Sequence, residues 1–196
     1  RVKNNLQLIS SIMNMQIRQA KTEDARFVLR RLQERILSLA TVHKNLYQDD
    51  NLVRVDAKVL LEEVMGQLLK VGLGPGGHVK ITQDFERISI DADDAAPLTL
   101  LTSEAITNAL KYLPQSSHDA RLEANLRLFG PEEARLTVTN SLGRVPSVTG
   151  TGLGSRLIDA FARQLNGQVE VEQTDSTYTL NVTFHVPKTA KQIYDY

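Results

Sequence analysis

The first 47 residues carry apolar positions three and four apart, and neither Pro nor Gly interrupts them. One apolar stripe runs from Val2 to Met13, and a second runs from Val28 to Leu46. Between them, Thr22 is followed by two acidic residues, which is typical of a helix start. The pattern therefore predicts two helices of about 20 and 25 residues joined by a short turn.

Two helices of this length cannot bury two apolar stripes against each other alone. Pairing two such hairpins into a four-helix bundle would cover both stripes. We therefore expect residues 1–50 to form a helical hairpin domain through which the protein is a homodimer.

From residue 51 onward, short alternating patterns typical of strands occur between amphipathic helical patterns. Strands are expected near residues 53–55, 79–85, 88–90, 122–129, 134–140, 168–174 and 177–186, and helices near 57–69, 94–113 and 152–165. Helices packed on one face of a mostly antiparallel sheet make a two-layer sandwich. The predicted fold class is α+β, with residues 51–196 as the second domain.

Charge is divided between these two units. Residues 1–47 hold nine Lys/Arg and three Asp/Glu, net +6, whereas residues 48–196 hold 14 and 20, net −6. Such a split favours two units with different partners. Aromatic residues make up only 5% and Trp is absent, which disfavours a nucleic-acid platform. No apolar run approaches the roughly 20 residues that cross a bilayer, and there is no cysteine, so we expect a cytoplasmic fragment without membrane contact.

A polar pattern lies on the helix expected near residues 94–113. Glu104, Asn108 and Lys111 are spaced i, i+4 and i+7, which places them on one helix face. Oxygen ligands suit Mg²⁺ and a lysine suits phosphate. Taken alone, the pattern fits either a Mg²⁺–polyphosphate site or an ordinary solvent-facing side of the helix.

The second chemical signal is a glycine-rich run, Gly150-Thr151-Gly152-Leu153-Gly154, that leads into a helix. Backbone N–H groups at a helix start bind anions, and glycine lets a phosphate come close. The spacing is neither the dinucleotide fingerprint nor the Walker A loop. The run therefore predicts a phosphate site of another kind.

These two stretches, together with the runs Arg1–Gln7 and Val42–Tyr47, resemble the catalytic core of bacterial sensor histidine kinases of the HisKA_2 type, relatives of the HWE kinases. The resemblance implies a dimeric hairpin followed by a Bergerat-type (GHKL) domain that binds ATP and Mg²⁺. It also implies phosphate transfer through a histidine to the aspartate of a response-regulator receiver domain. The basic hairpin fits such an acidic partner.

The resemblance also assigns roles to single residues. Residues 103–112 match the N box, where Glu104 and Asn108 are the expected catalytic residues and Asn108 is the Mg²⁺ ligand. Lys111 and Tyr112 are expected near phosphate. Residues 150–154 match the G2 box, which closes over ATP.

Two departures from the family pattern bear on activity. The acceptor histidine of the family directly precedes the stretch that begins at Arg1, and none of the four histidines, His43, His78, His118 and His185, occupies that position. The family's G1 box has an Asp that reads the adenine amino group. Here Thr139 stands at its place, Ser141 replaces the first glycine, and only Gly143 remains.

Thr139 or Asn140 could still accept a hydrogen bond from adenine, although a neutral acceptor binds more weakly than a carboxylate. The altered G1 box keeps two alternatives open. One is a relative that mainly acts as a response-regulator phosphatase or phosphotransfer protein. The other is a non-catalytic dimeric scaffold, which the intact N and G2 boxes disfavour.

Overall fold

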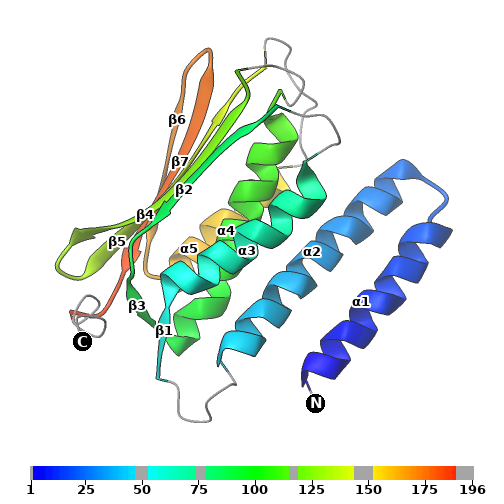
Figure 1. Cartoon of the computed structure of the whole chain (residues 1–196), viewed down its shortest axis with the longest axis horizontal. Coiled ribbons are helices and arrows are strands. Elements are labelled where there is room, and N and C mark those ends of the chain that lie inside the picture. The colour runs from blue at the N-terminus through cyan, green and yellow to red at the C-terminus, as the bar shows by residue number, and fades with distance from the viewer. Residues whose placement is uncertain (1, 47–52, 74–77, 115–118, 144–151, 189–196) are drawn as a thin grey trace.

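The computed structural model of the chain describes residues 2–46, 53–73, 78–114, 119–143 and 152–188. A helical hairpin lies beside a second unit in which three helices cover one face of a sheet (Figure 1). The predicted α+β class is confirmed. The division between residues 50 and 51 stays a prediction.

The hairpin consists of α1 (Val2–Gln19) and α2 (Glu23–Leu46). The expected helix start between them is confirmed, because the hydroxyl of Thr22 accepts a hydrogen bond from the backbone N–H of Ala25 at 3.2 Å. In the described ranges, no helix combines the length and the apolar character needed to span a membrane.

The main sheet has five strands, and only one pair of neighbours is parallel. In spatial order the strands are β2 (Lys80–Phe85), β4 (Arg121–Gly130), β5 (Glu133–Ser141), β7 (Thr177–His185) and β6 (Gln168–Gln173). β2 pairs with β4 in parallel, and the other pairs are antiparallel. β1 (Arg54–Asp56) and β3 (Ser89–Asp91) form a separate antiparallel pair.

Three helices cover one face of the sheet, which we call the inner face: α3 (Ala57–Gly72), α4 (Ala92–Tyr112) and α5 (Leu153–Gln164) (Figure 1). The side chains between the two layers are apolar and fully buried, and they include Leu60, Leu101, Ile106, Leu126 and Val182. Burial of such side chains is the main favourable term that holds the two layers together.

The opposite, outer face of the sheet is polar and is laced by hydrogen bonds between strands. The hydroxyl of Thr137 donates to Oδ1 of Asn181 at 2.8 Å. Next to this pair, the hydroxyls of Thr139 and Thr179 are 3.0 Å apart. Alternation of the strands thus sends apolar residues to the helices and polar residues to the outer face.

The hairpin contacts the second unit through α2, which packs against α3 and α4. Val42 is 4% exposed and belongs to the same apolar core as the sheet and its helices. In contrast, Val28 and Leu32 are 62% and 44% exposed. The apolar stripe predicted for dimerisation is therefore divided, since one part is covered within the chain and another part remains exposed.

Two glycines should respond to alanine in opposite directions. A Cβ at Gly167 would lie 2.6 Å from the backbone oxygen of Thr183 and 3.2 Å from that of Ala162. Because backbone cannot move aside cheaply, Gly167→Ala should destabilise the fold by about 1–3 kcal/mol. Gly66, inside α3, has no atom within 4 Å of such a Cβ.

Gly66→Ala should therefore stabilise the protein by roughly 0.5–1 kcal/mol through the better helix propensity of alanine. Urea unfolding followed by circular dichroism measures both changes. Equal effects of the two substitutions would contradict the close backbone approach at Gly167.

Candidate functional site

The N-terminal end of α5 lies against the C-terminal half of α4, at Asn108. A Cβ at Gly154 would lie 2.8 Å from Nδ2 and 3.0 Å from Oδ1 of Asn108, so only glycine leaves room beside this amide. Within the described residues, the Asn108 side chain forms no hydrogen bond to protein. The structure thus brings together one residue from each of the two predicted boxes.

The start of α5 is shaped for an anion. Gly152 precedes the helix with φ 70° and ψ −1°, a left-handed conformation that glycine adopts without strain. α5 begins at Leu153 and has no acidic residue in its first turn, so no side chain of that turn offsets the positive end of the helix dipole. Gly150 and Thr151 lie outside the described residues.

Thr139 and Asn140 point to opposite faces of the sheet, as neighbours in a strand do. Thr139 lies on the outer face with Thr179. Asn140 lies on the inner face, is 2% exposed, and donates from Nδ2 to the carbonyl of Ser141 at 3.0 Å. The two therefore cannot serve the same ligand, and Asn140 is the one on the side of the helices.

Tyr178 lies beside Asn140 on the inner face, and the sequence patterns did not single it out. β5 and β7 place the two residues directly opposite each other. Burial raises the pKa of the Tyr178 phenol, and the nearby Tyr112 and Asp159 raise it further. Tyr178 thus lies where α4, α5 and the end of the sheet meet. Only the pairing of β7 with β5 reveals this position, so the sequence patterns alone could not identify it.

Gly143 follows the end of β5, close to the end of α4. A Cβ on Gly143 would be 3.5 Å from Cβ of Pro114, an ordinary contact distance. The backbone N–H of Leu142, the residue before it, donates to the carbonyl of Ser176 at 2.8 Å. Gly143 is thus at the same end of the sheet as Asn140.

Glu104 and Lys111 turn toward α2 rather than toward α5. Both carboxylate oxygens of Glu104 are occupied, by Arg31 at 2.7 Å and Arg35 at 2.6 Å. Nζ of Lys111 lies 5.8 Å from the ring centre of Phe27 and 5.1 Å from that of Tyr112. In this arrangement, only Asn108 of the predicted trio borders the glycines.

Asn108 supplies an amide oxygen of the kind that Mg²⁺ binds, and Gly154 lies so close to this amide that a Cβ there would press on it. In the described parts of the chain, no group of three or more His, Asp or Glu could hold a metal ion. Mg²⁺ in proteins is commonly held by few protein oxygens, together with water and the phosphates of a bound substrate. The Asn108 oxygen is the donor that the described residues of α4 offer at this place.

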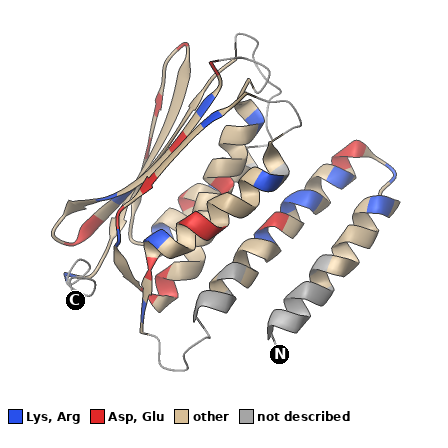
Figure 2. Cartoon of the chain, in the orientation of Figure 1, with Lys and Arg blue, Asp and Glu red and all other residues tan. Residues whose placement is uncertain are grey.

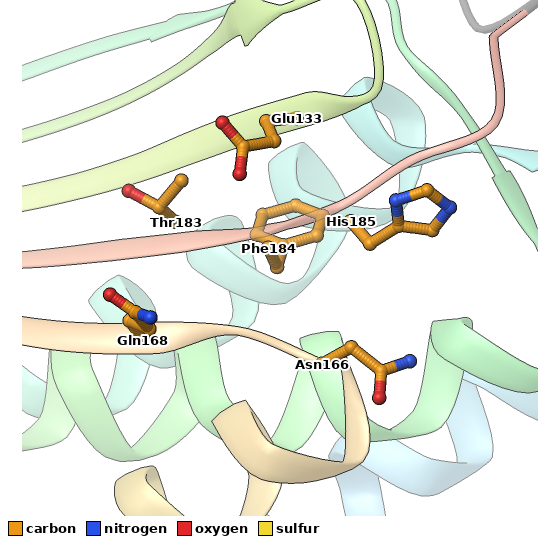
Figure 3. Close-up of a pocket in the computed structure, with 6 residues that line it drawn as sticks. All are labelled: Glu133, Asn166, Gln168, Thr183, Phe184 and His185. Atoms are coloured by element: carbon orange, nitrogen blue, oxygen red, sulfur yellow. The ribbon is translucent and has the colours of Figure 1, made fainter.

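A hollow of about 390 Å³ lies elsewhere on the second unit (Figure 3). It is lined by Glu133, Asn166, Gln168, Thr183, Phe184 and His185. Glu133 pairs with His185 at one end of the β5–β7 ladder, whereas Asn140 pairs with Tyr178 near the other. The hollow contains none of the predicted site residues.

Comparison with known proteins links both units to histidine kinases. Residues 1–71 match the HisKA_2 family of histidine kinases. The sensor histidine kinase PdtaS of Mycolicibacterium smegmatis is 30% identical over 127 residues, which are 63% of this chain and 23% of that protein. Blue-light-activated histidine kinase 2 of Erythrobacter litoralis is 21% identical over 188 residues, 93% of this chain and 54% of the relative. The chain thus spans about a quarter of the length of the first relative and about half of the length of the second.

Solved structures share the fold. The histidine kinase domain of the blue-light-activated kinase EL346 of Erythrobacter litoralis superposes with a TM-score of 0.71 at 15% identity, over 91% of this chain and 95% of that one. The catalytic domain of histidine kinase ThkA gives 0.54 at 12% identity, over 68% and 95%. The resemblance of this chain to the core of HisKA_2-type sensor histidine kinases is thereby confirmed, and its fold is that of the solved histidine kinase domains.

Proposed function

We propose that the chain is the core of a sensor histidine kinase that binds Mg·ATP between α4 and α5 and passes phosphate to a receiver-domain aspartate. The observation that carries the proposal is the contact of the Asn108 amide with Gly154 at the start of α5. An oxygen ligand and a helix start that meet in this way suit Mg²⁺ and phosphate together.

Each residue at the site has a proposed task. The Asn108 oxygen would bind the Mg²⁺ that accompanies ATP, and the bound ion would neutralise phosphate charge. The N–H groups at the start of α5 hold the phosphates, and Gly152 and Gly154 allow their approach. Asn140 accepts a hydrogen bond from the adenine amino group through Oδ1. Holding the reactants in place is most of what phosphoryl transfer requires.

Two further parts of the proposal rest on the family pattern. The acceptor histidine is expected directly before Arg1, on the first helix of the hairpin. The receiver domain is expected to bind the basic hairpin, and the hairpin is expected to form the homodimer. Arg31 and Arg35 are engaged by Glu104, so they add less to that positive surface than their number suggests.

A second candidate function is removal of phosphate from a response regulator. Its support is the altered G1 box, in which Thr139 stands at the place of the family's Asp and the neutral Asn140 is the acceptor left on the inner face. If nucleotide binding is weak, exchange of phosphate between the hairpin and a receiver domain would be the main activity.

Calorimetric titration with ATP and GTP, with Mg²⁺ and then with EDTA, tests the proposal. A carboxylate only accepts hydrogen bonds, whereas an amide both donates and accepts. We therefore expect Mg²⁺-dependent ATP binding with a smaller preference over GTP than a carboxylate would give. No binding of either nucleotide at millimolar concentration would refute the kinase proposal in favour of a scaffold.

A further inference from the structure

Two arginines from one helix bind a single buried carboxylate of another. Arg31 and Arg35 are one turn apart on α2, and both donate to Glu104 of α4, at 2.7 and 2.6 Å. The Glu104 side chain is only 3% exposed, and the arginine side chains are 14% and 22% exposed. Charge-assisted hydrogen bonds of this length to a buried carboxylate are strong and depend steeply on geometry.

The surrounding contacts also join α2 to α4. The hydroxyls of Ser38 and Ser103 are 2.7 Å apart and buried, one turn from the arginine pair. Lys111 reaches the ring of Phe27. The contacts that surround the arginine pair are therefore polar, as is common between units that separate and rejoin, whereas Val42 lies farther along α2 in the apolar core.

Arg31 has a second acidic neighbour on its own helix. The carboxylate of Glu34 lies 3.8 Å from Nη1 of Arg31. Burial raises the pKa of Glu34, Arg31 lowers it in part, and Glu104 raises it again. If α2 and α4 separate, Arg31 therefore keeps Glu34 as an acidic neighbour, and its charge is not left without a partner. Figure 2 shows that acidic and basic residues are interspersed along α2.

The docked arrangement keeps the two ends of the proposed reaction apart. Phe27, near the start of α2, lies beside Lys111 at the end of α4. α1 runs antiparallel to α2, so its first turn is at the opposite end of the hairpin (Figure 1). The 18 residues of α1 make this separation about 25 Å along the helix axis.

We propose that Arg31, Arg35 and Glu104 form a clamp that holds the hairpin on the catalytic unit in a resting state, and that the clamp must open before phosphate can reach the start of α1. The inhibitory role of the clamp, which we call the brake, rests on the proposed function, whereas the existence of the clamp does not. A rotation of α2 by a fraction of a turn would move both arginines away from Glu104. A signal that moves the hairpin in this way would therefore release the catalytic unit from it.

Distances between spin labels test the clamp directly. The chain has no cysteine, so Gln19→Cys and Asp175→Cys, both at exposed positions, give one label on each unit. Excess unlabelled chain removes signals between copies. We expect one narrow distance distribution in the parent chain and a broad, longer one in Arg31→Gln/Arg35→Gln. Unpairing buried Glu104 should drive the units apart.

Two controls separate the clamp from general effects. Arg18→Gln/Arg30→Gln removes two exposed arginines of the same hairpin and should leave the distribution narrow. Glu34→Gln removes the alternative acceptor of Arg31, so Arg31 should stay on Glu104 for more of the time. The distance distribution should then become narrower than in the parent chain, whereas misfolding would broaden it. A narrow distribution in Arg31→Gln/Arg35→Gln, or equal broadening in the control pair, would overturn the clamp.

Phosphate incorporation tests the brake in a chain extended by one helical turn that ends in a histidine before Arg1. The Arg31→Gln/Arg35→Gln variant should incorporate phosphate roughly 5-fold faster or more, and Glu34→Gln should incorporate it more slowly. Broad distances without a faster rate would overturn the inhibitory role. Failure of the parent chain to bind Mg·ATP in calorimetry would count against the proposed function, whereas the distances would still decide the clamp.

Discussion

Asn108→Ala should abolish Mg·ATP binding and, in the chain extended with a histidine before Arg1, the formation of acid-labile, base-stable phosphate. The amide oxygen of Asn108 is the only protein oxygen proposed for Mg²⁺. Loss of residues that merely support a metal ligand weakens binding 10–100-fold, so loss of the ligand itself should cost about 100-fold or more. Calorimetry and radiolabelled ATP measure the two effects.

The matched control is Asn125→Ala. Asn125 lies on β4 with its side chain on the outer face, away from the helices. The same substitution there should leave nucleotide binding and labelling unchanged. Undiminished ATP affinity in Asn108→Ala would contradict the proposed binding site between α4 and α5. Label on the chain without the added histidine would mean that another histidine accepts phosphate, and His43 would be the first to replace.

Val28→Lys/Leu32→Lys should convert the protein from a dimer into a monomer. Val28 and Leu32 lie one turn apart on α2, and α1 exposes Ile9, Ile12 and Met15. Exposed apolar side chains at these positions are expected to pack in the core of a four-helix bundle. Two buried ammonium groups without partners cannot be accommodated there. Light scattering at micromolar concentration measures the change in mass.

Val59→Lys/Val171→Lys provides the comparison, because these side chains are 46% and 52% exposed on α3 and β6 and lie outside the hairpin. It should remain a dimer. Both variants should keep the circular dichroism of the parent chain, since the substituted side chains are already exposed. A parent chain that is monomeric at micromolar concentration would contradict the proposed hairpin dimer.

Most of the fold followed from periodicity in the sequence. The helix start at Thr22 was predicted from its acidic neighbours and is confirmed by its hydrogen bond. The predicted strands and helices of the second unit are also present. Local patterns suffice here because each element buries one apolar face against the other layer.

The site could be predicted only in part, because its geometry depends on packing between distant segments. Spacing placed Glu104 and Asn108 on one face of a helix. It could not reveal that Arg31 and Arg35 of α2 donate hydrogen bonds to Glu104. The choice between Thr139 and Asn140 required the orientation of β5. Tyr178 emerged only from the pairing of β5 with β7.

The two edges of the sheet bear on how copies of the protein can meet. β6, at one edge, carries Glu170 and Glu172, and β2, at the other, carries Lys80 and Asp84. Antiparallel pairing of β6 with the same strand of another copy would bring these carboxylates beside like charges, so this edge resists strand addition and aggregation. At the β2 edge the two charges are opposite, and protection by like-charge repulsion is therefore confined to β6.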